Sequence, residues 1–164
     1  MLVNFDSLAS TSKIWIYQSN REFSAQEVVE ISRDLENFIG NWKRHGEDLK
    51  ASYLIKYNQF IVVAVDENYQ EVSGCSIDAS VNLMKQFERK FSIDLTNKLN
   101  ISFKDNNNIN VVSMANFQHY AEQQKITSNT VVFNNMITNK ADFEQNWEVT
   151  ADKSWHKRFL VINN

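Results

Sequence analysis

The 164-residue chain contains no proline, only three glycines and a single cysteine. One cysteine cannot close an internal disulfide, so we expect a reducing, cytoplasmic environment. Because proline and glycine are so scarce, the sequence offers no obvious linker, and asparagine must supply many of the turns and helix caps. These absences and the length favour a single domain over residues 1–164.

Long apolar runs and an excess of positive charge are also missing. No stretch approaches the ~18 apolar residues that a membrane helix needs, and residues 1–6 lack the basic run and apolar segment of a secretory signal. Seventeen basic residues stand against twenty acidic ones, a formal net charge of −3, which gives no broad positive field to attract nucleic acid. We therefore expect a cytoplasmic protein that binds neither membranes nor nucleic acid.

Two segments carry the apolar spacing of amphipathic helices. The first starts at Ser24, which with Glu27 forms a capping-box pattern, and its apolar residues recur over 28–42. Gly46 is its expected end. The second helix is expected over 77–91, where apolar residues again gather on one side.

Four segments have the character of β-strands: 13–17, 50–56, 59–65 and 99–104. The first and third are apolar on both faces, as strands inside a sheet are, whereas the second and fourth alternate as edge strands do. With the two helices, the order over 12–105 is βαββαβ, the ferredoxin-like split unit, whose first and third strands are central. The predicted fold is therefore α+β, an antiparallel sheet with both helices on one face.

The remaining segment, 106–164, is rich in aromatic residues and poor in charge. Its pattern predicts strands at 110–113 and 130–133, helices at 114–124 and 139–147, and a closing arm at 155–159. A ferredoxin-like sheet leaves one face bare, from which Trp15 and Tyr17 are expected to point. We expect the C-terminal extension to cover that face, and a homodimer burying it is the alternative to a monomer.

Two stretches are similar to parts of an ATPase. Phe60 to Glu67 resembles a Walker B strand, and residues 72–76 resemble the ABC signature loop, Leu-Ser-Gly-Gly-Gln. A P-loop enzyme also needs G-x-x-x-x-G-K-[ST], which does not occur in the chain. The signature also precedes Walker B in ABC ATPases, the reverse of the order here. The sequence therefore excludes a P-loop ATPase.

A wider resemblance extends over nearly the whole chain. It is carried by Lys13–Ser19, the segment from Trp42 to Ala51, Ser73–Asp78, Val132–Asn135 and Trp155-His156. In these stretches the chain resembles a family of small, functionally uncharacterised bacterial proteins, known mainly from Bacteroidetes and often labelled "ABC transporter ATPase". The resemblance implies a bacterial protein and transfers no catalytic residue.

The candidate site is the sequence Ser-Gly-Cys-Ser-Ile-Asp over 73–78, where a strand-like run gives way to the second helix. Free amides at a helix start attract anions, so we expect a small anionic ligand, such as a carboxylate or phosphate, to bind there. The expected ligand-binding residues are Ser73, Gly74, Cys75, Ser76, Asp78 and Arg21. A binding protein with this ligand or a protein partner is the favoured function.

A thiol-dependent enzyme with Cys75 as nucleophile is the alternative, since a helix start favours the thiolate. His45, His119 or His156 would be its base. The simpler interpretation is that Cys75 is a small buried residue at a strand–helix joint. His45 is expected at the end of the first helix and His156 on the surface of the terminal arm. Three scattered histidines lack ligand spacing, so we expect no metal and no cofactor.

Overall fold

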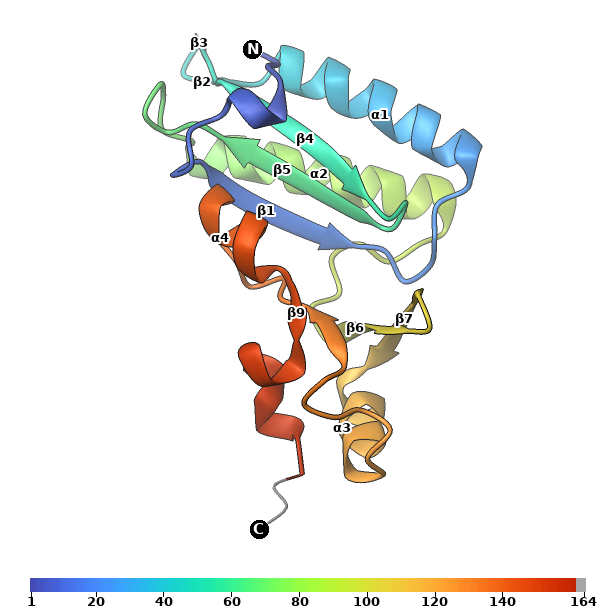
Figure 1. The fold of residues 1–164 in the computed structure, drawn as a ribbon. Coiled ribbons are helices and arrows are strands. Elements are labelled where there is room, and N and C mark those ends of the chain that lie inside the picture. Colours follow the sequence, from blue (N-terminus) through green and yellow to red (C-terminus); the bar gives the residue numbers. More distant parts are fainter. Residues whose placement is uncertain (162–164) are drawn as a thin grey trace. The chain divides into compact units, whose positions relative to one another are not determined.

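The computed structural model describes residues 1–161 (Figure 1). Helices and antiparallel strands are mixed along the chain, which confirms the α+β class. The described residues form two compact units, the first made of Met1–Thr96 with Thr138–Ala141 and the second of the rest. That residues 1–164 fold as one domain stays a prediction.

The first unit contains a three-stranded antiparallel sheet with the order β1-β5-β4. Its strands are β1 (Lys13–Gln18), β4 (Ala51–Lys56) and β5 (Phe60–Val65). All of β5 is buried, as expected for the central strand. Tyr57 and Asn58 have positive φ in the tight turn between β4 and β5, as their place in the sequence predicts.

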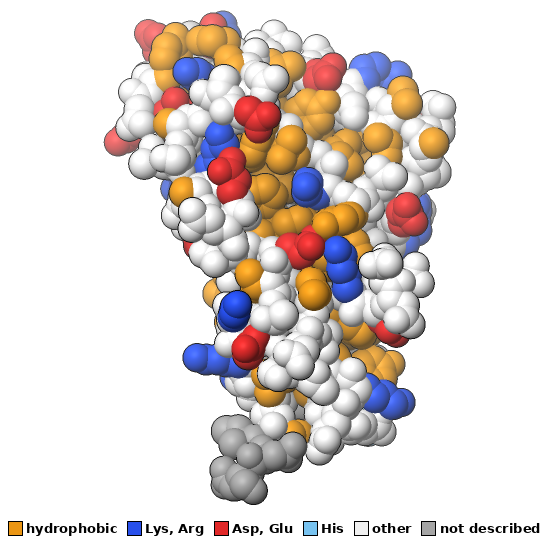
Figure 2. Space-filling model, viewed as in Figure 1, with side chains coloured by type: hydrophobic (Ala, Val, Ile, Leu, Met, Phe, Trp, Pro, Cys, Tyr) orange, Lys and Arg blue, Asp and Glu red, His pale blue; other side chains and the backbone are white. Residues whose placement is uncertain are grey.

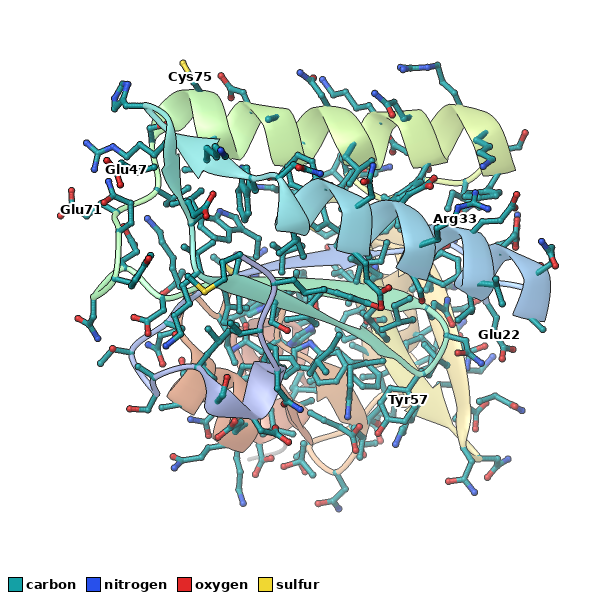
Figure 3. All side chains as sticks on the ribbon, turned by 90° about the horizontal axis from the view of Figure 1, so that it is seen from above. Glu22, Arg33, Glu47, Tyr57, Glu71 and Cys75 are labelled. Carbon is teal, nitrogen blue, oxygen red and sulfur yellow. The ribbon has the colours of Figure 1, made fainter. Side chains whose placement is uncertain are left out.

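Helices α1 (Ala25–Gly40) and α2 (Gly74–Phe91) cover one face of this sheet (Figures 1 and 3). Alternate residues of β5 point toward them and share a core with Leu35 of α1 and Phe87 of α2. The predicted capping box of Ser24 and Glu27 is formed at the start of α1. Sequence periodicity therefore located both helices.

The end of α1 was predicted wrongly. The helix stops at Gly40, and Gly46 lies in a small hairpin between β2 (Lys43–Arg44) and β3 (Glu47–Asp48). Its φ of +82° and the φ of +49° at His45 are those of a tight turn. His45 is therefore a turn residue, and not the C-terminal helix residue expected from the sequence.

Two expectations for β1 were also wrong. Tyr17 belongs to the core under the helices, and Trp15 packs against it, so neither points from the opposite face. β1 is also an edge strand of the sheet, although it is apolar on both faces. The Ile14 N–H donates to the Thr138 carbonyl at 2.9 Å, so a distant segment runs along this edge.

The β4 edge is covered in a similar way by the N-terminus. The Ala51 N–H donates to the Met1 carbonyl at 3.1 Å, and the Val3 N–H donates to the Ala51 carbonyl at 3.0 Å. Both edges of the first sheet therefore carry a partner segment, which hides backbone groups that would otherwise pair with other chains.

The second unit contains a four-stranded antiparallel sheet with the order β7-β6-β8-β9. Its strands are β6 (Asn100–Asp105), β7 (Asn108–Ser113), β8 (Val131–Phe133) and β9 (Glu148–Thr150). The helices are α3 (Met114–Glu122) and α4 (Lys140–Asn146), the latter starting on residues of the first unit. Three short 3₁₀ turns, η1 (Phe5–Ser7), η2 (Ala151–Lys153) and η3 (Trp155–Phe159), complete the described elements.

β6 is the predicted fourth strand of the ferredoxin-like sheet, but it pairs with β7 and β8 and not with β1. Asn106 and Asn107 both have positive φ and form a two-residue turn that folds β7 directly onto β6. Both edges of β6 are thus occupied, and the ferredoxin-like topology is not confirmed. Coverage of the first sheet by residues 106–164 stays a prediction, except that Thr138–Ala141 belong to the first unit.

On the face drawn in Figure 2, Lys and Arg side chains alternate with Asp and Glu, and no large area of one sign appears. This agrees with the near balance of charges in the sequence and lends no support to a nucleic-acid surface on this face.

Candidate functional site

A shallow groove of about 500 Å³ lies in the first unit between the end of α1, the β2–β3 hairpin and the start of α2. Three of the expected ligand-binding residues, Ser73, Cys75 and Ser76, line it. The lining also includes Lys43 and His45. The groove therefore places two side chains that can carry positive charge beside the predicted helix-start loop.

The two serines hold the start of α2 in place. The Ser76 N–H donates to the Ser73 side-chain oxygen at 3.2 Å, the bond of an N-cap residue. The buried Ser76 hydroxyl donates to the Lys43 carbonyl at 2.9 Å and lies 2.8 Å from the Ser73 hydroxyl. Both hydroxyls are thus committed to structure, and the prediction that they bind a ligand directly stays untested.

The backbone amides of Gly74 and Cys75 are free within the described residues. They begin α2, and no acceptor within residues 1–161 bonds their N–H groups. The first turn of α2 also contains no acidic residue. The positive end of the helix dipole is therefore not neutralised by the helix itself.

Trp42 is a buried residue in the lining of the groove. Its indole Nε1 donates to the Ser76 carbonyl at 2.9 Å, and the side chain is 4% exposed. Its ring also lies 5.2 Å from the Phe38 ring, centroid to centroid. The bond from the indole to the Ser76 carbonyl ties the segment after α1 to the first turn of α2, and so holds the residues that line the groove in place.

Cys75 is exposed, which contradicts the interpretation of a buried residue at the strand–helix joint. Figure 3 shows its sulfur at the start of α2, directed away from the helix. His45 lines the same groove, from the β2–β3 turn. A thiol and an imidazole therefore share one groove wall, an arrangement that the sequence spacing alone did not indicate.

Arg21 lies at the other end of α2. Its guanidinium donates to the Phe91 carbonyl at 2.8 Å and to both carboxylate oxygens of Glu27 at 2.8 Å. An 18-residue helix is about 27 Å long, so Arg21 is not a neighbour of the loop at 73–78. Asp78 is exposed and does not line the groove.

The bond to Arg21 has an electrostatic consequence at the start of α1. Hydrogen bonds from Arg21 above all, and from the Ser24 backbone, lower the pKa of Glu27 to about 2. Glu27 in turn raises the pKa of Arg21 above its usual value. The predicted ligand residue Arg21 is thus already paired with a carboxylate of its own unit.

The other two histidines belong to the second unit, and His156 was predicted wrongly. It is fully buried, not on the surface, because Trp155 stacks on it at 4.0 Å and Phe117 lies 5.5 Å away. Its Nδ1 is 2.7 Å from the Ser154 hydroxyl. Burial, and to a smaller extent the charge of Arg158, lower the pKa of His156 to about 4.

The acids at the end of the Walker B-like strand have a local explanation. Asp66 is buried, lies 3.8 Å from the Lys50 ammonium and accepts the Asn68 N–H at 3.0 Å. It therefore shapes the turn after β5. Within residues 1–161, no group of three or more His, Cys, Asp and Glu side chains is arranged to hold a metal ion.

None of the helices in residues 1–161 is both long and apolar enough to cross a bilayer.

Lys43 and Trp42 were missed as site residues, although a signal existed. A basic pair, Lys43-Arg44, and an acidic pair, Glu47-Asp48, flank His45-Gly46. Opposite charges around a residue followed by glycine are typical of a hairpin, and the pairs do lie opposite each other. Interpreting this stretch as a helix end concealed the groove wall.

No protein-family model, no curated protein and no solved structure matches this chain. The resemblance to the Bacteroidetes family therefore stays a prediction, and the function of the groove has to be argued from its geometry.

Proposed function

We propose that this chain is a binding protein that holds a small anionic ligand, a carboxylate or a phosphate, in the groove at the start of α2. The observation that carries the proposal is the pair of free amides at Gly74 and Cys75. They lie at the N-terminal start of an 18-residue helix that has no acidic residue in its first turn. Such a helix start binds anions through its N–H groups and its dipole.

The surroundings of the two amides support an anion. Lys43 and His45 line the groove. The Lys43 ammonium lies 3.8 Å from an Asp48 carboxylate oxygen, and its side chain is 52% exposed, so it remains accessible to a ligand. A groove of about 500 Å³ has the size of a small-molecule site. The exposed thiol of Cys75 is also consistent with the cytoplasmic location that we propose.

The test is a titration of the ¹⁵N-labelled chain with inorganic phosphate and, separately, with acetate. We expect the amide signals of Gly74 and Cys75 to shift most, and the melting temperature to rise. Lys43→Gln should weaken binding, whereas Lys85→Gln, an exposed lysine further along α2, is the matched control and should not. Unchanged signals at residues 73–78 with both anions would refute the proposal.

A thiol-dependent enzyme is the second candidate, favoured by one observation: Cys75 and His45 line the same groove. In this scheme His45 accepts the Cys75 proton and the thiolate attacks the substrate. Iodoacetamide alkylation of the folded chain at a series of pH values separates the candidates. Fast labelling below the ordinary thiol pKa, lost in His45→Gln, supports the enzyme. Labelling with an ordinary thiol profile leaves Cys75 as a groove residue of a binding protein.

A further inference from the structure

The sheet of the second unit has one long edge that pairs with no other strand of residues 1–161. β7 lies at the end of the strand order, and its outer side pairs with no other described strand. The opposite edge strand, β9, has only three residues and includes Glu148, which pairs with Lys104 at 3.2 Å. A short strand with a charge is a protected edge, whereas β7 has none of these features.

The backbone groups on the outer side of β7 can be identified from the turn. In a hairpin with a two-residue turn, the residues flanking the turn form a hydrogen-bonded pair, here Asp105 and Asn108. Pairs alternate from there, so Ile109 and Val111 direct their N–H and C=O groups away from β6. These four groups remain available to another strand.

The composition of β7 favours a copy of itself as that strand. The sequence is Asn-Ile-Asn-Val-Val-Ser, so none of its six residues is charged, and two copies meet without like-charge repulsion. Three of its four inner residues, Ile109, Val111 and Val112, are β-branched, which suits strand pairing. A contact of one surface with itself closes at a dimer by two-fold symmetry.

We propose that two copies of this chain associate through β7, antiparallel, and join their four-stranded sheets into one. The available groups define the register: Ile109 of one copy lies opposite Val111 of the other, which satisfies all four outward groups of each copy. The two-fold axis then passes between the two Asn110 residues, whose side chains are half-buried and uncharged. This surface lies within the second unit and is independent of the groove.

The test measures oligomeric state by sedimentation velocity over a concentration series of the full chain. We expect a dimer that Val111→Pro dissociates, because proline removes an outward N–H from each copy and leaves the pairing with β6 intact. The loss of two hydrogen bonds raises the dissociation constant about 30-fold. Val111→Thr keeps the N–H group and the branched shape, and as the matched control it should remain dimeric.

A disulfide trap tests the register even if the proline variant does not fold. In a Cys75→Ser background, Asn110→Cys should cross-link into a covalent dimer on oxidation, because the two residues lie opposite each other at the axis. Leu99→Cys, at a residue that is 64% exposed outside β7, is the control and should not. A wild-type chain that is monomeric at roughly 100 μM, that grows into open-ended aggregates, or that forms dimers without this cross-link would overturn the proposal.

Discussion

The two long helices begin with the same cap and differ in their charge. At α1 the Ser24 side chain accepts the Glu27 N–H at 3.1 Å, and at α2 the Ser73 side chain accepts the Ser76 N–H at 3.2 Å. At α1 the third helical residue is a glutamate, whose carboxylate accepts the Ser24 N–H at 2.8 Å. At α2 the same position is a serine.

This difference separates a helix start that carries its own carboxylate from one that carries none in its first turn. The Glu27 carboxylate supplies an anion at the start of α1, and Arg21 fixes it there. The start of α2 has no such group, and Cys75 in its first turn lines a groove with Lys43 and His45. Our proposal therefore assigns the difference between the two helix starts to one residue, three positions after the cap.

The largest expected effect comes from removing the support of the α2 start. Trp42→Ala deletes a buried indole and its bond to the Ser76 carbonyl, so it should lower the free energy of unfolding by about 3–5 kcal/mol. Trp42→Phe keeps much of the packing and should cost about 1–2 kcal/mol. Urea unfolding measures both. A cost below about 1 kcal/mol for Trp42→Ala would show that the indole does not hold the two helices together.

Glu27→Gln removes the charge at the α1 start and should cost about 1 kcal/mol near neutral pH. Because the pKa of Glu27 is lowered from 4.5 to about 2 in the folded chain, the contribution of its charge is full above pH 4.5 and is lost as the pH falls toward 2. The difference in stability between wild type and variant should therefore shrink over that range. Urea unfolding at several pH values measures it.

Titration of His156 also changes stability with pH, but it does so equally in wild type and Glu27→Gln and therefore drops out of the difference between them. Its pKa is lowered from 6.5 to about 4, so its contribution to stability is full above pH 6.5 and is lost as the pH falls toward 4 in both proteins. A difference between wild type and Glu27→Gln that stays constant down to pH 2 would contradict the role of the Arg21–Glu27 pair.

Ser24→Ala and Ser73→Ala test whether the two caps are equivalent. Each removes one side-chain acceptor of a helix N–H, and each should cost about 1 kcal/mol. We expect Ser73→Ala to cost slightly more, because the Ser73 hydroxyl also lies 2.8 Å from that of Ser76. Thermal unfolding of the two variants in parallel is sufficient. A cost at only one helix would mean that the caps are not alike and that charge is not the main difference between them.

Cys75→Asp should remove the difference in charge between the starts of α1 and α2, with only a small change in the free energy of unfolding. It adds an acid to the first turn of α2 at an exposed position, so it should stabilise the chain by about 0.5 kcal/mol and weaken phosphate binding. Cys75→Asn has nearly the same shape without the charge and serves as the control. Melting curves with and without phosphate measure both effects, and unaltered phosphate binding by Cys75→Asp would place the anion elsewhere.

Local signals in the sequence were reliable. The Ser24–Glu27 capping box predicted the start of α1, and the expectation that asparagine supplies turns is met at Asn106 and Asn107, between β6 and β7. Both depend on residues within a few positions of each other, so their physical cause is contained in a short window of sequence.

Features that depend on distant contacts were not predictable in the same way. Apolar character on both faces predicted that β1 lies inside the sheet. The strand lies at the edge, but residues 138–139 pair with it there. His156 looked like a surface residue between charged neighbours, whereas packing with Phe117 buries it. The groove itself combines three segments. The α2 segment and the charge pairs around His45-Gly46 carried local signals, but neither indicated that the segments meet.

Lys140 lies in Thr138–Ala141, the short segment by which the chain returns to the first unit. Its ammonium is almost wholly buried and donates to the Leu8 carbonyl at 2.8 Å and to the Asp6 carbonyl at 3.2 Å. A fragment that stops at Thr96 would lack both this cation and the strip along β1. Cutting the chain at that boundary would therefore yield a fragment with an uncovered β1 edge and two carbonyls that have lost the Lys140 donor. A synthetic peptide containing residues 138–141 would be the natural supplement for it.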